Sequence, residues 1–119
     1  MPKTVLVVDD DEGIQNLVGM ALVDEGYEVI AALNGAIGLE MATQHPVDMI
    51  LLDMRMPVLD GWGFLDAYCS RPEPRAPVVA FSANIVDPEA FRCASGFFPK
   101  PFKLSKLLDM VDKYANTSS

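Results

Sequence analysis

The sequence predicts an α/β fold, a single domain of five βα units in which a parallel sheet lies between two layers of helices. Short apolar runs alternate along the chain with segments of helical periodicity. The apolar runs are continuous, which is typical of parallel strands buried on both faces. The 119 residues, 50% of them hydrophobic, provide apolar side chains for one core. We therefore expect one domain over residues 1–119.

Five short apolar runs, most of them rich in β-branched or aromatic residues, are the predicted strands. They cover residues 5–8, 29–32, 49–52, 77–81 and 97–98. With helices between them, these strands predict a (βα)5 doubly wound parallel five-stranded sheet, for which we expect the flavodoxin-like strand order 2-1-3-4-5.

Apolar residues at helical spacing mark the segments between the strands. The first helix carries apolar residues from 14 to 22 and is expected to stop near Gly26. The second covers residues 36–42 and ends before His45-Pro46, because the residue ahead of a proline avoids helical angles. Further helices are expected over residues 61–69 and 103–113.

Polar residues stand directly after four of the predicted strands. They are Asp9, Asp10 and Asp11 after the first strand, Asp53 after the third, Ser82 after the fourth and Lys100 after the fifth. Ligand sites of open parallel sheets lie beyond the carboxyl ends of the strands. We therefore expect these side chains to meet in one small region.

A cluster of carboxylates at one sheet edge predicts a divalent cation. Several carboxylates in a small space repel one another unless a cation or a lysine compensates their charge. All-oxygen ligation with room for water suits Mg²⁺, whose open positions are usually filled by phosphate oxygens. Asp53 can then be a nucleophile toward phosphorus, with Lys100 and Ser82 stabilising the charge on the phosphoryl oxygens. Each acid after the first strand is alone a candidate helix cap, but three in succession exceed what a cap requires.

These residues resemble the receiver domain of bacterial two-component response regulators. The likeness covers nearly the whole chain and depends on four pieces at the ends of four strands. The pieces are Asp9-Asp10, the run Asp53-x-x-Met56-Pro57-x-x-Asp60-Gly61, Ser82-Ala83 and Lys100-Pro101-Phe102. Within the run, Asp60 and Gly61 are expected to be structural, as a cap and a permissive glycine at a tight turn.

The resemblance implies a signalling switch rather than an enzyme, with self-phosphorylation and self-dephosphorylation as its only activities. A sensor histidine kinase or a phosphotransfer protein would donate a phosphoryl group to Asp53. Asp10 and Asp53 would bind Mg²⁺ together with the backbone carbonyl of Arg55, and Asp9 would act close by as part of the metal site.

The resemblance also implies how the switch would respond. Ser82 would bond the phosphoryl group and move toward it, Lys100 would pair with it, and the aromatic side chain of Phe97 would turn inward. Where receivers often have tyrosine, this chain has phenylalanine, which gains more from burial. We therefore expect an inward Phe97 even without phosphate. A cis Lys100-Pro101 bond is also expected from the family.

The stretch between Ser82 and Lys100 is about one helical turn shorter than is usual in the family. The missing residues must come from the fourth helix, for which Asp87 as cap and Pro88 at the first helical position are one plausible start. We expect a fourth helix of roughly two turns, short or mobile, since so short a helix needs packing to be stable.

The acidic composition limits the partners of the domain. A formal charge of −8 and a pI of about 4.4 argue against direct binding to nucleic acid. No apolar run is long enough to span a bilayer, so we expect a cytoplasmic protein with protein partners, its downstream effector unidentified. Cys69 and Cys93 have no metal-type spacing and are read as ordinary half-buried thiols rather than a disulfide.

Three other functions fit part of the pattern. A flavin carrier shares the fold but needs a glycine- and hydroxyl-rich phosphate loop where this chain places three acids. A phosphohydrolase with an aspartyl-phosphate intermediate typically carries a second aspartate two residues after the nucleophile, where this chain has Arg55. The third alternative is a receiver fold that acts only as a protein-interaction module. The sequence also leaves open whether the chain is a stand-alone regulator or one part of a longer protein.

Overall fold

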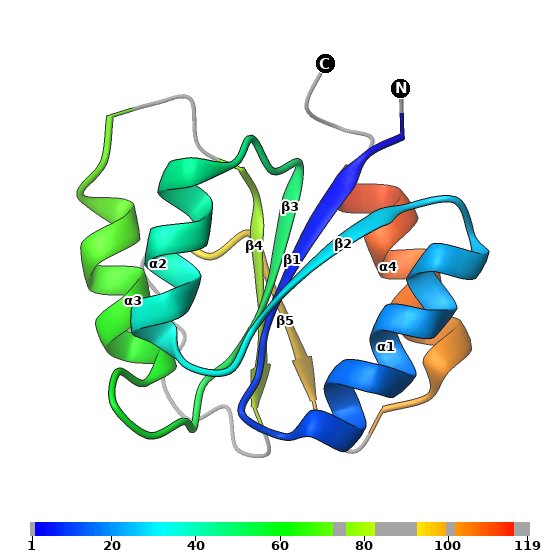
Figure 1. Ribbon diagram of the computed structural model, residues 1–119, viewed down its shortest axis with the longest axis horizontal. Coiled ribbons are helices and arrows are strands. Elements are labelled where there is room, and N and C mark those ends of the chain that lie inside the picture. The colour runs from blue at the N-terminus through cyan, green and yellow to red at the C-terminus, as the bar shows by residue number, and fades with distance from the viewer. Residues whose placement is uncertain (1, 73–75, 83–92, 100–101, 116–119) are drawn as a thin grey trace.

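A five-stranded parallel sheet forms the centre of the computed structural model, which describes residues 2–72, 76–82, 93–99 and 102–115. Its strands are β1 (Thr4–Val8), β2 (Glu28–Ala32), β3 (Met49–Asp53), β4 (Val78–Ser82) and β5 (Gly96–Pro99). They lie side by side in the order β2-β1-β3-β4-β5, with all carboxyl ends at the lower edge in Figure 1. The predicted strand order is confirmed.

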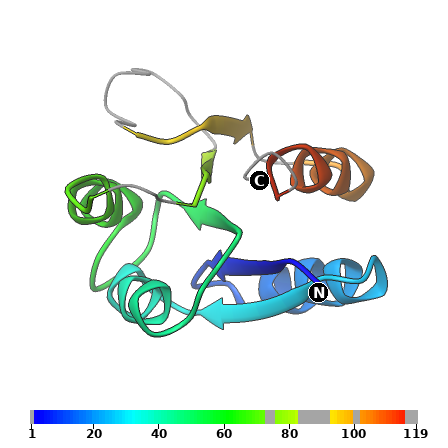
Figure 2. The same cartoon turned by 90° about the horizontal axis from the view of Figure 1, so that it is seen from above.

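Helices cover both faces of the sheet, as predicted. They are α1 (Glu12–Asp24), α2 (Gly35–Gln44), α3 (Gly61–Cys69) and α4 (Leu104–Ala115). Figure 2 shows α2 and α3 at one side of the molecule and α1 and α4 at the other. Each pair of helices closes its own apolar cluster against the central strands. Among the helices described, none has both the length and the apolar character needed to cross a membrane.

The ends of the first two helices follow the expected local rules. α1 begins after its cap, Asp11, whose carboxylate accepts hydrogen bonds from the first turn. It ends just before Gly26, whose φ of 96° is a conformation that glycine adopts without strain. α2 ends at Gln44, ahead of His45-Pro46. These boundaries place the start of α1 directly at the carboxyl end of β1.

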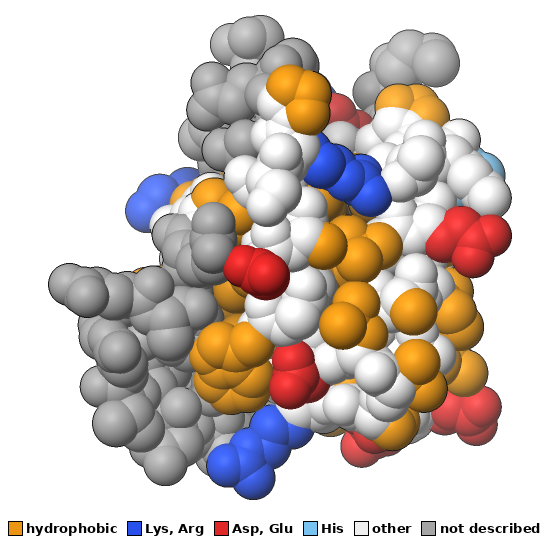
Figure 3. Space-filling view, turned by 90° about the vertical axis from the view of Figure 1, so that its left-hand side faces the viewer, with side chains coloured by type: hydrophobic (Ala, Val, Ile, Leu, Met, Phe, Trp, Pro, Cys, Tyr) orange, Lys and Arg blue, Asp and Glu red, His pale blue; other side chains and the backbone are white. Residues whose placement is uncertain are grey.

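Arg71 joins the ends of α2 and α3. Its guanidinium donates hydrogen bonds to the carbonyl oxygen of Leu39 at 3.1 Å and to Oγ1 of Thr43 at 2.6 Å. It also lies over the ring of Tyr68, 5.2 Å from the centroid. Figure 3 shows this side of the molecule, where apolar side chains lie among charged ones. The carboxyl end of α3 is therefore held by its neighbours.

Cys69 and Cys93 form a disulfide, so the prediction of two free thiols was wrong. Cys69 is the last residue of α3, and Cys93 precedes β5. Both are half-buried, as expected, and their Cα atoms are 5.6 Å apart, within the range that a disulfide spans. The spacing of 24 residues carries no signal of this pairing. The pairing arises because the chain returns beside α3 after β4.

Phe97 is 36% exposed, so the prediction of an inward ring was wrong. β5 is an edge strand whose side chains alternate between the two faces of the sheet. Phe98 takes the face of α1 and α4, where its ring centroid lies 6.1 Å from that of Phe81 and 5.6 Å from that of Phe102. Phe97 takes the other face. Because β5 has a neighbouring strand on one side only, the ring of Phe97 is left partly exposed.

Two predictions concern residues outside the described part of the chain. The short fourth helix falls on residues 83–92, and the cis peptide bond falls on Lys100-Pro101. Both therefore remain predictions. The final helix, α4, was expected over residues 103–113 and spans Leu104–Ala115.

Candidate functional site

Three carboxylates meet at the carboxyl edge of the sheet. One oxygen from each of Asp9, Asp10 and Asp53 lies within 4.8 Å of the other two. Asp9 is completely buried, Asp53 is 6% exposed and Asp10 is exposed. The register of β1 and β3 pairs Val8 with Leu52, so Asp9, which follows β1, and Asp53, which ends β3, lie at the same level. This group of three is called the acidic cluster below.

Backbone contacts hold Asp9 in place. Its N–H donates to the carbonyl oxygen of Ala32 at the end of β2, at 3.0 Å. One of its carboxylate oxygens, Oδ1, accepts a hydrogen bond from the N–H of Asp11 at 2.9 Å. The turn after β1 is therefore fixed at the point where it carries two acidic side chains toward β3.

Asp11 has a different role from the two acids that precede it. Its Oδ1 accepts hydrogen bonds from the N–H groups of Gly13 at 2.8 Å and Ile14 at 3.2 Å. It is thus the cap of α1, and the acidic cluster does not include it. The run of three aspartates divides into two acids that face β3 and one that starts a helix.

Asp53 ends β3 beside the end of β4. It pairs with Phe81 in the sheet, and the N–H of Met54 donates to the Phe81 carbonyl oxygen at 3.1 Å. The N–H of Arg55 approaches Oδ1 of Asp53 at 3.4 Å. Ser82 is the last residue of β4 and pairs with Pro99. Its backbone therefore lies one residue beyond Phe81, the residue that pairs with Asp53. Lys100 follows Pro99 directly and lies outside the described residues.

The donor set of the acidic cluster fits Mg²⁺. Hard divalent cations take oxygen ligands, and Mg²⁺ is usually bound through one or two carboxylates while keeping several waters. Two nearly buried carboxylates beside an exposed one supply oxygen ligands with access for water on the side of Asp10. A cation would also relieve the repulsion among three neighbouring negative charges.

Gln15, which the sequence analysis did not single out, holds the backbone that carries Asp9 of the acidic cluster. This buried side chain of α1 donates from Nε2 to three carbonyl oxygens, those of Val7 at 2.9 Å, Asp9 at 3.1 Å and Ala32 at 2.8 Å. It thereby ties the ends of β1 and β2 together. The sequence does contain a signal, because Gln15 lies on the same helical stripe as the buried Val18 and Leu22.

Gln15→Leu is expected to lower the free energy of unfolding by ~1–3 kcal/mol, because the substitution removes the donor and leaves buried carbonyl groups less satisfied. Chemical denaturation measures this change. Asn16→Leu is the matched control, since Asn16 is exposed on the same helix and should change stability little. An equal effect of both substitutions would show that the three hydrogen bonds of Gln15 contribute nothing specific.

Asp60 has the capping role expected from the sequence, whereas Gly61 is needed for a close approach of two segments and not for the conformational freedom expected of it at a tight turn. Asp60 caps α3 and accepts a hydrogen bond from the N–H of Gly63 at 2.8 Å. Gly61 lies against the end of β3: a Cβ there would meet the Cα of Met54 at 2.6 Å and the carbonyl oxygen of Asp53 at 2.9 Å. The missing side chain therefore allows α3 to start beside Asp53.

Gly61→Ala is expected to lower the free energy of unfolding by ~1–3 kcal/mol, because the added methyl group overlaps backbone atoms that cannot move independently. Gly19→Ala is the control, since a Cβ at Gly19 meets only Val29 Cγ1 at 3.9 Å. That change should stabilise α1 by up to ~1 kcal/mol through helix propensity. Equal stability of the Gly61→Ala and wild-type proteins in thermal or urea unfolding would contradict the close approach.

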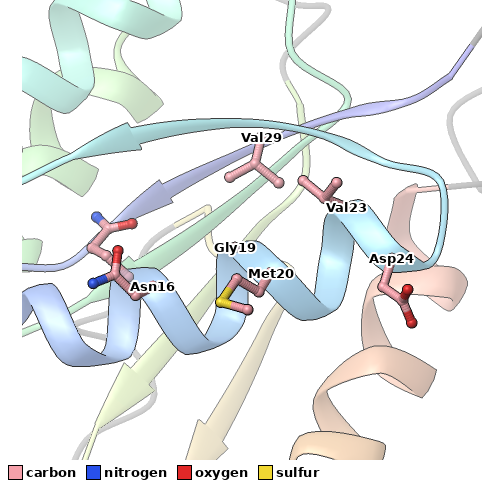
Figure 4. A pocket seen from close by; sticks show the side chains of 7 residues that line it. Asn16, Gly19, Met20, Val23, Asp24 and Val29 are labelled. Atoms are coloured by element: carbon pink, nitrogen blue, oxygen red, sulfur yellow. The ribbon is translucent and has the colours of Figure 1, made fainter.

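The outer face of α1, the helix that starts beside the acidic cluster, carries exposed apolar side chains. Leu17, Met20 and Val23 are 55%, 74% and 61% exposed. Figure 4 shows the open groove beside them, in which Gly19 and Met20 of α1 lie opposite Val29 of β2. Exposed apolar surface of this extent is commonly a site of protein contact.

Comparisons with known proteins identify the family of this chain. The family described as the response regulator receiver domain matches residues 5–112. Sporulation initiation phosphotransferase F of Bacillus subtilis (strain 168) is 31% identical over 118 residues, which cover 96% of this chain and 94% of that protein. Transcriptional regulatory protein GlrR of Escherichia coli (strain K12) is 34% identical over 115 residues, 93% of this chain, but the chain spans only 26% of that protein.

Solved structures show the same fold and, in one case, a metal. The chemotaxis response regulator CheY4 of Vibrio cholerae has a TM-score of 0.85 at 30% identity, covering 96% of this chain and 99% of that one. The receiver domain of a sensor histidine kinase from Pseudomonas aeruginosa PAO1 has a TM-score of 0.86 at 25% identity, covering 98% and 100%. In that structure a magnesium ion is coordinated in the active-site cleft. Sequence, fold and comparisons together show that this chain belongs to the response regulator receiver domain family.

Proposed function

We propose that this receiver domain is a phosphorylation-dependent signalling switch in which Asp53 accepts a phosphoryl group from a sensor histidine kinase or a phosphotransfer protein. The observation that carries the proposal is the acidic cluster at the end of β3. Receiver domains accept phosphoryl groups from such donors, and Asp53 is the carboxylate that ends the central strand. The donor of this particular chain is identified only by its chemistry, a phosphorylated histidine.

The proposed transfer is a displacement at phosphorus. One carboxylate oxygen of Asp53 forms a bond to the phosphorus while the bond from phosphorus to the donor's imidazole nitrogen breaks. The imidazole leaves with the electron pair and takes a proton, and Asp53 becomes an acyl phosphate. Later hydrolysis of the acyl phosphate returns the carboxylate and inorganic phosphate, which resets the switch.

We assign the Mg²⁺ ligands to Asp10, Asp53 and the backbone carbonyl of Arg55, with Asp9 completing the acidic environment. Bound Mg²⁺ would supply positive charge to the phosphoryl oxygens during the transfer. Asp9 and Asp53 are nearly buried and held by backbone contacts, so their side chains need little reorganisation to act.

Ser82 and Lys100 complete the proposed site. Ser82 would donate its hydroxyl to a phosphoryl oxygen, and Lys100 would pair with the phosphoryl charge. The backbone position of Ser82, at the end of the strand next to β3, supports its part. Phe97 on the exposed side of β5 is the proposed aromatic element of the switch, turning inward only when the domain is phosphorylated.

The phosphodonor protein would dock on the apolar face of α1. This face carries Leu17, Met20 and Val23 and starts beside Asp10, so a partner seated on it would bring its histidine toward Asp53. We place the domain in the cytoplasm. We assign it protein partners and not nucleic acid, because its formal charge of −8 opposes contact with nucleic acid phosphates.

A small phosphodonor such as acetyl phosphate, added with Mg²⁺, tests the proposal by intact mass. We expect one phosphoryl group per chain, lost on treatment with hydroxylamine as an acyl phosphate is. Absence of an adduct, or an adduct stable to hydroxylamine, would contradict the proposal. Turnover of an added phosphomonoester would instead favour a phosphohydrolase, against which the presence of Arg55 two residues after Asp53 argues.

A further inference from the structure

Cys69 and Cys93 are already held at bonding distance by the structure around them. Their Cα atoms are 5.6 Å apart, and the N–H of Cys93 donates to Sγ of Cys69 at 3.1 Å. Cys69 and Ala94 pack against the same apolar cluster beneath α2 and α3. The backbone on both sides of the bond is therefore positioned by packing as well as by the bond itself.

The bond lies at the amino-terminal end of an edge strand. β5 pairs only with β4 in the described sheet, and its residues are less buried than those of β1 or β3. Just before β5, the N–H of Ser95 donates to the carbonyl oxygen of Val78 at 2.7 Å. The carbonyl oxygen of Ser95 accepts a hydrogen bond from the hydroxyl of Tyr114 at 3.3 Å. The covalent link to α3 adds to these contacts at the start of β5.

Both cysteines are half-buried rather than fully enclosed, so we expect small thiols to reach the bond. In a reducing compartment such as the cytoplasm proposed above, disulfides are rare and those that form are usually transient or redox-sensing. A pair that is preassembled and accessible suits reversible exchange better than permanent cross-linking.

We propose that Cys69 and Cys93 are a redox modification site, closed by low-molecular-weight disulfides and opened by low-molecular-weight thiols, that sets how firmly the start of β5 is attached to α3. Closing balances as a thiol–disulfide exchange. One cysteine thiolate attacks a disulfide RSSR and releases RS⁻, which takes a proton. The other thiolate then attacks the mixed disulfide and releases the second RS⁻, so two cysteines are oxidised and one RSSR becomes two RSH.

This site is separate from the acidic cluster. β4 begins at the edge where the disulfide lies and ends at Ser82, about 13 Å away at ~3.3 Å per residue. Oxidation therefore changes the attachment of β5 without changing the carboxylates of the acidic cluster. The proposal does not depend on phosphorylation of Asp53, and its test can fail or succeed independently of that function.

The test begins with the wild-type chain equilibrated at defined ratios of reduced and oxidised glutathione. After alkylation of free thiols, intact mass counts them. We expect both thiols to disappear together, and to return together when reduced glutathione is in excess. Cys69→Ser and Cys93→Ser are the controls, each expected to form only a mixed disulfide with glutathione. Thiols that stay free in the oxidising mixture, or a bond in the folded protein that glutathione does not open, would overturn the proposal.

Hydrogen exchange then tests the effect on β5. In the reduced protein we expect the β5 amides that donate to β4 to exchange roughly tenfold faster or more, as edge elements open with low free energies. The amides of β1 and β3 should exchange equally in both forms. The double variant Cys69→Ser/Cys93→Ser should reproduce the reduced form. Equal protection of β5 in oxidised and reduced protein would overturn the inference.

Discussion

Asp53→Asn is expected to take up no phosphoryl group from acetyl phosphate and Mg²⁺, whereas the wild-type chain takes up one. The substitution replaces a carboxylate oxygen by an amide nitrogen of nearly the same shape, so the end of β3 is kept while the nucleophile is lost. Asp53 ends the central strand β3, and the N–H of Arg55 approaches its Oδ1. Intact mass measures the uptake directly.

Asp60→Asn is the control for this experiment. Asp60 belongs to the same connection between β3 and α3, and its role is to cap α3. Asparagine caps a helix about as well as aspartate, so the control should fold and take up one phosphoryl group. Full labelling of Asp53→Asn would refute the assignment of the phosphoacceptor, and loss of labelling in both variants would point to a disturbed loop instead.

Asp10→Asn is expected to weaken Mg²⁺ binding about tenfold or more, because ligand charge strongly determines the affinity of a hard cation. Isothermal titration calorimetry measures the affinity. Asp10 is exposed, so the fold should tolerate the change. Without Mg²⁺ the variant should unfold at a slightly higher temperature than wild type, since one of three neighbouring negative charges is gone. The gain in stability on adding Mg²⁺ should shrink accordingly.

Asp11→Asn is the matched control for Asp10→Asn. Asp11 is the next residue, it is also exposed, and its carboxylate faces the first turn of α1. Its replacement keeps the cap and removes a charge outside the acidic cluster, so Mg²⁺ affinity should fall much less. If Asp10→Asn binds Mg²⁺ as tightly as wild type, Asp10 is a neighbour of the metal site and not a ligand.

The fold was predictable largely because its central strands are buried on both faces. Continuous apolar runs such as residues 49–52 leave little choice of sheet type, and helices on both sides follow from the need to cover them. The acidic cluster was predictable for a related reason. In a parallel sheet all strands end at the same edge, so Asp9 and Asp53 had to come close although 44 residues separate them in the sequence.

The features that escaped prediction depend on contacts between segments that are far apart in the sequence. Gln15 lies on the buried stripe of α1, but its role becomes evident only when the three carbonyl groups around it are placed. The Cys69–Cys93 bond depends on where the chain returns after β4. The exposure of Phe97 follows from its place on an edge strand, which outweighs the tendency of a phenylalanine to be buried.

The central claim is that Asp53 carries the phosphoryl group, and chemical trapping tests it most directly. Borohydride reduces an aspartyl phosphate to homoserine, and peptide mass spectrometry then identifies the altered residue. After treatment with acetyl phosphate and Mg²⁺, we expect homoserine at position 53, with Asp9, Asp10 and Asp60 unchanged. Homoserine at one of those aspartates, or none in a protein shown by intact mass to be phosphorylated, would contradict the claim.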